Sequence, residues 1–419
     1  MVVNAKLPPL VVRFRGERYA PARVSAVLAP PYDVITPADR VRYAARDPHN
    51  IVHLIVPEAA EAENRYARAA TMLEGWRREG VLKRDSADAV YVVAQGYALP
   101  TGERRTRLGM FAAVAAEPFA SARVRPHERT HAAPKADRLA LLEATRTNLE
   151  SIFLLAPDAD RALALALGRI AAGPPDMQGE LDGVDIRLWV VAGAAAQELA
   201  TLAGREALYI ADGHHRDETA VAYARTHPEA NRVLSLVVSA TDPGLTILPT
   251  HRIIFGADPD LEGLIAAWRQ WFDVGRAAPC TDRVERLAEL GRERTACVVA
   301  FPGEHDLTLV LKPDAALDKV PELGTVHAVR ELDIARVETL VVRMILGAGT
   351  TTPMLSYTAD PRAAFAAVRG GGAAAAVLVN PTRVEQVFAV ADSGSAMPPK
   401  STYFVPKVPS GLVMMPVST

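Results

Sequence analysis

Short apolar runs alternate with amphipathic stretches along most of the chain. Consecutive or alternating apolar residues predict strands, whereas apolar residues spaced three and four apart predict helices. We expect strands at residues 51–56, 89–98, 107–115, 152–155, 186–191, 207–210, 232–240, 245–248, 296–301, 306–311 and 374–379. We expect helices at residues 38–46, 59–79, 136–148, 261–272, 329–346 and 360–369. This mixture predicts a mixed α/β or α+β fold rather than a helix bundle or an all-β sandwich.

The chain length bears on domain organisation. At roughly 150 residues per domain, 419 residues favour two or three domains. Candidate seams lie at residues 173–175, 257–259 and 370–372. We divide the chain into an elaborated core, residues 1–258, and a C-terminal α/β extension, residues 259–419. We expect the candidate site in the core, with the last segment, residues 394–419, packed back on it.

Composition and charge narrow the functional classes. The 47 Lys and Arg residues nearly balance the 49 Asp and Glu residues, so the net charge of −2 argues against a chain-wide nucleic-acid surface. The two cysteines, Cys280 and Cys297, exclude a disulfide framework and a cysteine-based metal site. The apolar runs are too short to cross a bilayer, and the first residues lack the pattern of a secretory signal. We therefore expect a cytoplasmic protein without membrane contact.

The segment at residues 208–220, LYIADGHHRDETA, is the strongest candidate for chemistry. An apolar strand runs into Asp212 and Gly213, and a helix is expected to begin directly after them. Asp212 suits the N-cap, and the free N–H groups of the first turn favour an anion such as phosphate. His214, His215 and Arg216 add donors and a positive charge at the same place. A capped helix with a solvated first turn is the alternative, but this combination of residues favours a functional site.

A second segment, RPHERTH at residues 125–131, precedes a predicted helix. Glu128 is a candidate general base, and nearby arginine and lysine side chains are suited to phosphate oxygens. A charged surface loop explains the segment equally well. His127 and His131 have metal-ligand spacing only if they are helical, and the prolines around them favour a loop.

Two shorter segments are weaker candidates. Prolines stiffen a loop that presents Tyr32 and Asp33, and Thr36 then caps the next helix. Rigid packing is at least as good an explanation of that loop as ligand contact. His251 and Arg252 follow a predicted strand. Two interpretations are open: the two residues contribute to the candidate site, or they only end the strand.

A C-terminal segment nearly matches a phosphate-binding P-loop. Gly394 is followed at the expected spacing by Lys400 and Ser401, but Pro399 replaces the second glycine. Proline has no N–H group and a fixed φ, so it cannot help to cradle phosphate, and the following residues are expected to be extended. We reject a P-loop here. Lys400, Ser401 and Thr402 remain candidates for a phosphate contact, against the alternative of a rigid closing segment.

Several of these segments together resemble one family. The residues that carry the resemblance are 29–35, 50–54, 126–130, 137–139, 210–216, 249–252 and 397–404. In this order they are similar to the family known as domain of unknown function 1015. Asp217 departs from the pattern, because the family often has an aromatic residue there.

The Asp-Gly-His-His-Arg segment also resembles the motif of free-serine kinases in the ParB/sulfiredoxin-like superfamily. The resemblance implies a ParB/sulfiredoxin-like core with large insertions and phosphorylation of the L-serine hydroxyl by ATP or ADP. It also implies that a glutamate acts as base and that the Asp-His-His-Arg group handles phosphate and metal.

Our leading hypothesis is a nucleotide-dependent small-molecule kinase that acts on free L-serine. Glu128 would accept the hydroxyl proton, Asp212 would help to hold Mg²⁺, and His214, His215 and Arg216 would stabilise charge. The expected nucleotide-binding residues are Gly213, Arg129, Thr130, Lys135, Arg138, Lys400, Ser401 and Thr402. The expected substrate-binding residues are Tyr32, Asp33, His127, His251 and Arg252.

Two other classes stay open. One is a ParB-like nucleotide-binding regulator or DNA-associated protein, although the sequence shows only short basic clusters and no basic recognition helix. The other is a metal-dependent hydrolase that uses His127, His131, His214 and His215. The sequence alone does not decide the substrate, the donor nucleotide or the oligomeric state, a homodimer included. It also leaves open whether Glu128 and residues 212–216 share one cleft.

Overall fold

A computed structural model describes residues 7–58, 64–277, 283–347 and 354–417. Cys280 and the start of the helix expected at residues 59–79 lie outside the described residues. The chain forms two compact units. Residues 1–246 and 406–419 form the first, and residues 247–405 form the second, so the chain passes between the units twice.

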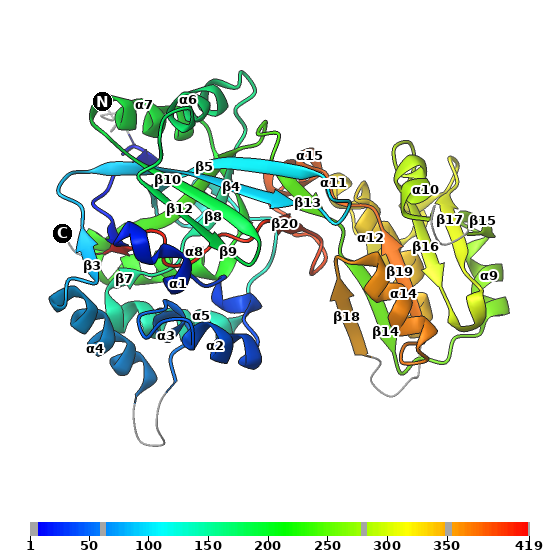
Figure 1. Ribbon diagram of the computed structural model, residues 1–419. Helices are drawn as coiled ribbons and strands as arrows, with labels where there is room; N and C mark the ends of the chain where they lie inside the picture. The colour runs from blue at the N-terminus through cyan, green and yellow to red at the C-terminus, as the bar shows by residue number, and fades with distance from the viewer. Residues whose placement is uncertain (1–6, 59–63, 278–282, 348–353, 418–419) are drawn as a thin grey trace, which may run out of the picture. The chain divides into compact units, whose positions relative to one another are not determined.

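The first unit is built on a large mixed sheet (Figure 1). Its strands, in spatial order, are β6 (Val124–Arg125), β11 (Leu208–Asp212), β8 (Ile152–Ala156), β12 (Arg232–Ser239), β5 (Arg104–Ala115), β4 (Ala89–Ala98), β10 (Val184–Ala192) and β9 (Met177–Leu181). The short strand β1 (Val11–Val12) also pairs with β5. The pairs β11–β6 and β12–β8 are parallel, and the other pairs are antiparallel. The mixed α/β class is therefore confirmed.

The two faces of this sheet differ in chemistry. On one face the even-numbered side chains of β4 and β5, such as Val92 and Ala112, form an apolar core with α6 (Ala162–Ala171) and α7 (Gly193–Ala203). Because side chains alternate along a strand, the odd-numbered residues face the other way. That second face carries Gln95 and Arg107. The mainly apolar strands β4 and β5 thus also carry two buried polar side chains, Gln95 and Arg107.

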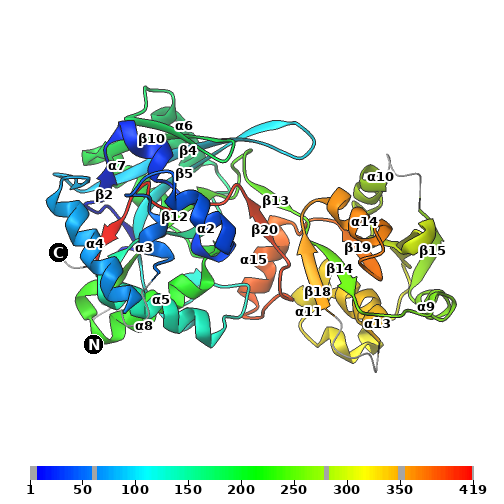
Figure 2. The same ribbon diagram turned by 60° about the horizontal axis from the view of Figure 1, so that its bottom comes forward.

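Helices α3 (Val52–Ile55), α4 (Arg65–Arg78), α5 (Ala132–Thr145) and α8 (His214–Thr226) pack in sequence on one another. Helix α8 also contacts strands β8 and β12, and it lies beside α5 in both views (Figures 1 and 2). The expected strand at residues 51–56 is wrong, because the chain forms α3 there. The amide of Asn50 donates to the carbonyls of Ala26 and Leu28 and accepts from Val52 N, which ties the start of this helix to a neighbouring segment.

The second unit contains a six-stranded antiparallel sheet. Its strands, in spatial order, are β15 (Phe272–Arg276), β17 (Leu307–Leu311), β16 (Ala296–Ala300), β19 (Ala375–Val379), β14 (His251–Phe255) and β18 (Met354–Thr358). Helices α10 (Arg283–Leu290) and α14 (Pro361–Arg369) supply apolar side chains to its core (Figure 2). The strand β20 (Tyr403–Val405) confirms the extended chain expected after Lys400, and it pairs with β13 (Thr246–Leu248). None of the helices in the described ranges is long and apolar enough to span a membrane.

Candidate functional site

The turn between β11 and α8 carries the Asp-Gly-His-His-Arg segment. Strand β11 ends at Asp212, and α8 begins at His214. Gly213 has a φ of 91°, a value that glycine adopts without strain. A Cβ atom there would lie 3.1 Å from both Arg216 Nε and Ile152 Cγ2. The N-cap role expected for Asp212 is wrong: Gly213 is the N-cap, and no side chain caps the helix among the described residues. Asp212 Oδ1 accepts from the adjacent Gly213 N at 2.9 Å.

Asp212 has a cationic partner that the sequence did not reveal. Its Oδ2 lies 3.0 Å from Nζ of Lys407, in the C-terminal segment of the same unit. Burial opposes ionisation of this carboxyl, but Lys407 and Arg216 outweigh burial and lower its pKa to about 2. Asp212 is therefore a carboxylate at any physiological pH, fixed at the head of the turn.

The loop at residues 126–131 rests against the first turn of α8. His127 N donates to His214 Nε2 at 3.4 Å, and the two rings meet edge to face with centroids 4.7 Å apart. His131 N donates to His215 Nε2 at 2.9 Å. Since each Nε2 accepts a hydrogen bond, a neutral ring carries its proton on Nδ1. This arrangement leaves His215 an Nδ1–H group as a donor.

The buried histidines are neutral at neutral pH. Burial lowers the pKa of His127 to about 4 and that of His214 well below its usual value. The pKa of the partly buried His215 is also lowered by burial. The four histidines form two pairs rather than one group, and no cluster of three or more His, Cys, Asp or Glu side chains suited to a metal occurs in the described parts of the chain.

The positions of the other predicted residues in this loop follow from these contacts. Glu128 is partly buried and directly follows His127, so its backbone lies beside the first turn of α8. Arg129 is exposed, and Thr130 is partly exposed. Lys135, on α5, forms a 2.5 Å ion pair with Glu218 on α8. The loop and the turn, both singled out from the sequence, are therefore neighbours in the fold.

A third predicted segment joins the same region through Glu150, which sequence reasoning missed. Glu150 is buried and accepts hydrogen bonds from Tyr32 N at 2.9 Å and from Arg138 at 3.3 Å. The guanidinium of Arg138 stacks 4.1 Å from the centre of the Tyr32 ring. Arg216 donates to the carbonyl of Ser151, beside Glu150.

This network determines what the predicted residues can reach. Arg138 is buried, and its donors serve Asp137, Glu150 and the carbonyl of Ile55. It therefore positions the Tyr32 loop. Asp33 is exposed and acts electrostatically on both His215 and Arg216. The Asp33 carboxylate therefore contributes to the electrostatic environment of the first turn of α8.

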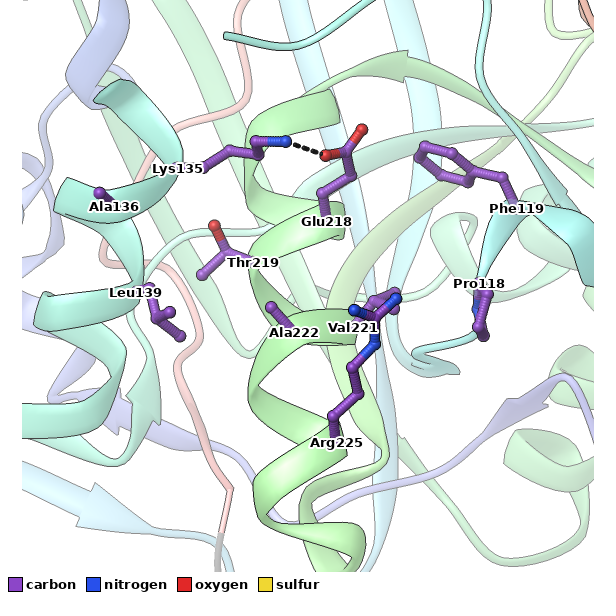
Figure 3. A pocket seen from close by; sticks show the side chains of 10 residues that line it. All are labelled: Pro118, Phe119, Lys135, Ala136, Leu139, Glu218, Thr219, Val221, Ala222 and Arg225. Carbon is purple, nitrogen blue, oxygen red and sulfur yellow. Dashed lines mark hydrogen bonds and ion pairs between the residues drawn. The ribbon is translucent and has the colours of Figure 1, made fainter. Parts of the chain in front are cut away.

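A pocket of about 320 Å³ lies between α5, α8 and the short helix η3 (Phe119–Ser121). Figure 3 shows Pro118 and Phe119 on one side, Lys135, Ala136 and Leu139 of α5 on the other, and Glu218, Thr219, Val221, Ala222 and Arg225 of α8 between them. His215, Thr219 and Ala222 recur at helical spacing, so the pocket follows the face of α8 that carries His215. From His215 to Ala222 the helix rises about 10 Å.

The remaining predicted residues belong to the second unit. His251 is buried, and its Nδ1 accepts from Val379 N at 3.2 Å. Arg252 is also buried, and its Nε donates to Glu338 at 3.1 Å. Lys400 is exposed. The Ser401 hydroxyl donates to the Pro398 carbonyl at 2.6 Å. The hydroxyl proton of Ser401 is therefore donated to a carbonyl three residues earlier in the same turn.

Thr402, the last predicted residue of that segment, is partly exposed and precedes β20 in the second unit. The five predicted residues of the second unit therefore belong to a different compact unit from the Asp212–Arg216 turn.

Fold and site together define a class: a mixed α/β protein in which a charged turn joins a sheet strand to a helix N-terminus. The chain belongs to the family described as protein of unknown function (DUF1015), which matches residues 11–335. None of the curated proteins matches the chain.

Among solved structures the chain is similar to a conserved hypothetical protein from Pyrococcus furiosus, with 12% identity, a TM-score of 0.35, and coverage of 72% of this chain and 93% of the other. It is also similar to a free serine kinase in complex with AMP, with 13% identity, a TM-score of 0.37, and coverage of 72% and 92%. A third likeness is to SbnI with C-terminal truncation from Staphylococcus aureus, with 13% identity, a TM-score of 0.38, and coverage of 73% and 87%. At these TM-scores the similarity carries no information about the site. The site is therefore interpreted from the residues of this chain alone.

Proposed function

We propose that this protein is a nucleotide-dependent kinase that phosphorylates the hydroxyl of a small hydroxy amino acid, with L-serine as the first candidate. The observation that carries the proposal is the turn at Asp212–Arg216, where a carboxylate, free helix N–H groups, a histidine donor and an arginine meet. Phosphoryl transfer requires mainly positioning and charge stabilisation, which this set of groups supplies. The ParB/sulfiredoxin-like core belongs to the same proposal.

The phosphates of the donor would lie over the N-terminus of α8. The first-turn N–H groups and the helix dipole favour an anion there. The Nδ1–H group of His215 and the guanidinium of Arg216 would add hydrogen bonds to the phosphoryl oxygens. The nucleoside would lie in the pocket along the same face of α8. There Phe119 offers a stacking surface and Glu218 offers hydrogen-bond acceptors.

In the proposed reaction, a bond forms between the serine Oγ and the phosphorus while the bond from phosphorus to the nucleotide oxygen breaks. The hydroxyl proton passes to a carboxylate, which we assign to Glu128 because its loop lies against the first turn of α8. The nucleotide leaves with one phosphate fewer, as ADP from ATP or as AMP from ADP.

The donor set of the turn fits Mg²⁺. Magnesium needs only one or two protein carboxylates when phosphates supply other ligands, and Asp212 is an ionised carboxylate at the turn. When bound, Mg²⁺ would neutralise charge on the phosphates. Lys407 holds Asp212 Oδ2, so the ammonium of Lys407 orients this carboxylate and balances its charge.

The direct experiment incubates the purified full-length chain with ATP or ADP, Mg²⁺ and L-serine and measures O-phosphoserine by mass spectrometry. A panel of other hydroxy amino acids follows. Product with one acceptor supports the proposal, and absence of product with both donors and every acceptor overturns it. Nucleotide binding without transfer, together with salt-sensitive DNA binding, would favour the regulatory alternative.

The assignment of Glu128 needs its own pair of variants. We expect E128Q to lower kcat strongly and leave nucleotide affinity intact, whereas D33N should raise KM for the acceptor. The opposite result, with kcat lost in D33N and kept in E128Q, would move the base to Asp33, whose carboxylate acts on His215 and Arg216.

A further inference from the structure

Arg107 is a buried cation that the proposed mechanism does not use. It lies on β5, opposite Gln95 of β4, and is 1% exposed. One terminal nitrogen, Nη2, donates to Gln95 Oε1. In the described parts of the chain, Nε and Nη1 have no hydrogen-bond acceptor. These two atoms carry three of the five N–H bonds of a guanidinium.

Such an arrangement is costly unless something compensates for it. Burying a charge without hydrogen-bonding partners costs several kcal/mol, so unpaired buried donors are rare in folded proteins. The face of the Phe153 ring, 4.6 Å from the guanidinium carbon, gives a cation–π contact that offsets part of this cost but supplies no acceptor oxygen for Nε or Nη1. Burial lowers the pKa of Arg107 only to about 10, so the side chain stays charged at neutral pH.

Arg107 is connected to the Asp212 turn. Gln95, the partner of Arg107, donates through Nε2 to the carbonyl of Lys407 at 3.1 Å, and Lys407 Nζ binds Asp212. Phe153, beneath the guanidinium, is opposite Asp212 in the pairing of β8 with β11. Tyr97, Asp242 and Asp212, in decreasing order, act on Arg107 electrostatically. The unpaired N–H groups thus lie close to the turn, on the sheet face opposite the α6–α7 core.

We propose that Arg107 binds the carboxylate of the acceptor amino acid beside the Asp212–Arg216 turn. Nη2 of Arg107 has a second N–H bond besides the one that it donates to Gln95. Together with an N–H bond of the unpaired Nη1 or Nε, it forms a parallel pair that matches a carboxylate. In a hydroxy amino acid such as serine, only Cα and Cβ separate the reacting hydroxyl from the carboxylate, so a carboxylate receptor must lie near the phosphoryl site. The other cations of the turn have other roles in the proposed function, since Lys407 pairs with Asp212 and Arg216 is assigned to the phosphoryl oxygens. This inference rests on the proposed function for the identity of the acceptor.

The test measures binding by isothermal titration calorimetry to the full-length protein and to R107Q, with R187Q as the matched control. Arg187 is an exposed arginine of the same sheet. We expect R107Q to weaken L-serine binding tenfold to a hundredfold, because a hydrogen bond to a charged group is worth about 1.5–3 kcal/mol. Binding of ADP should stay unchanged in R107Q, and R187Q should match the wild type throughout. Ethanolamine, which lacks the carboxylate, should bind the wild type and R107Q equally.

The remaining outcomes separate this inference from the proposed function. If R107Q loses ADP affinity instead, the guanidinium binds a phosphate and the inference is overturned. If O-phosphoserine forms and R107Q binds L-serine normally, the inference fails while the kinase stands. If no acceptor is phosphorylated, thermal unfolding with acetate is the deciding readout: stabilisation of the wild type and not of R107Q supports a carboxylate site, and no stabilisation of either overturns it. R107K, which keeps the charge, replaces R107Q if that variant does not fold, and it should bind L-serine less tightly than the wild type.

Discussion

Each unit of the molecule contains a buried arginine in its sheet, and the two arginines differ in their hydrogen-bond partners. Arg252 in the second unit donates to the Glu338 carboxylate at 3.1 Å and to the Thr250 carbonyl. Arg107 in the first unit donates to one neutral amide and leaves Nε and Nη1 unpaired among the described residues. A buried cation with its own carboxylate is explained by the fold, since breaking such a pair is strongly destabilising. For the buried cation without one, we propose a ligand, the carboxylate of the acceptor.

The largest expected effect concerns Asp212, the carboxylate that Lys407 binds in the first unit. We expect D212N to lower O-phosphoserine formation by about a hundredfold to a thousandfold, because removing one preorganised charge from a phosphoryl-transfer site has effects of that size. The control is D160N, at an exposed aspartate that pairs with Arg205 on the surface of the same unit. Equal activity of D212N and D160N in the phosphoserine assay would remove Asp212 from the site.

The free energies of unfolding of two variants test the comparison between the two arginines directly. We expect R252M to lower the free energy of unfolding by about 3 kcal/mol, because it leaves the partly buried Glu338 without its cation. R107M should stay within about 1 kcal/mol of the wild type, since it removes an incompletely paired buried charge. Urea denaturation of both variants measures the difference. A loss in R107M as large as that in R252M would show that Arg107 is structural.

Asp217 extends the comparison to a buried carboxyl. It lies in the first turn of α8, one of its oxygens has no partner among the described residues, and burial raises its pKa to about 7. Because this folded-state pKa lies above the usual value of 3.8, the folded protein holds the proton more tightly, and stability from this group is lost as the pH rises from about 4 to 7.

We therefore expect D217N to gain stability over the wild type across that pH range and to keep a constant advantage above it. Thermal unfolding at several pH values measures the effect, with D88N, at an exposed position, as control. A difference between D217N and the wild type that does not change with pH would contradict the raised pKa.

The smallest effect is expected at an uncharged position. F119A should weaken nucleotide binding by about tenfold, as expected for an aromatic contact worth about 1.5 kcal/mol, and should leave L-serine binding unchanged. Leu165, an exposed apolar residue of α6, provides the control variant L165A. Loss of L-serine binding in F119A, with nucleotide binding intact, would place the acceptor rather than the nucleoside in the pocket of Figure 3.

The amino-acid sequence by itself determined much of this picture. Alternation and apolar runs located the main strands, because side-chain burial repeats with the period of the backbone. The Asp-Gly-His-His-Arg turn was recognisable because its residue types are adjacent in the chain and Gly213 is required by the backbone. The short apolar run at residues 51–56 misled, since so short a stretch fits a buried helix turn as well as a strand.

Only the tertiary structure decided which distant residues meet. Lys407 and Glu150 belong to no recognisable motif, and nothing local indicates that Lys407 binds Asp212 or that Glu150 accepts from Tyr32 and Arg138. The pairing of β4 with β5 put Gln95 and Arg107 on one buried face, where an ordinary strand arginine became a charge without a carboxylate partner. The physical reason is that sequence patterns record which side chains are buried, whereas the partner of a buried charge is chosen by strand register and by segments that return from far along the chain.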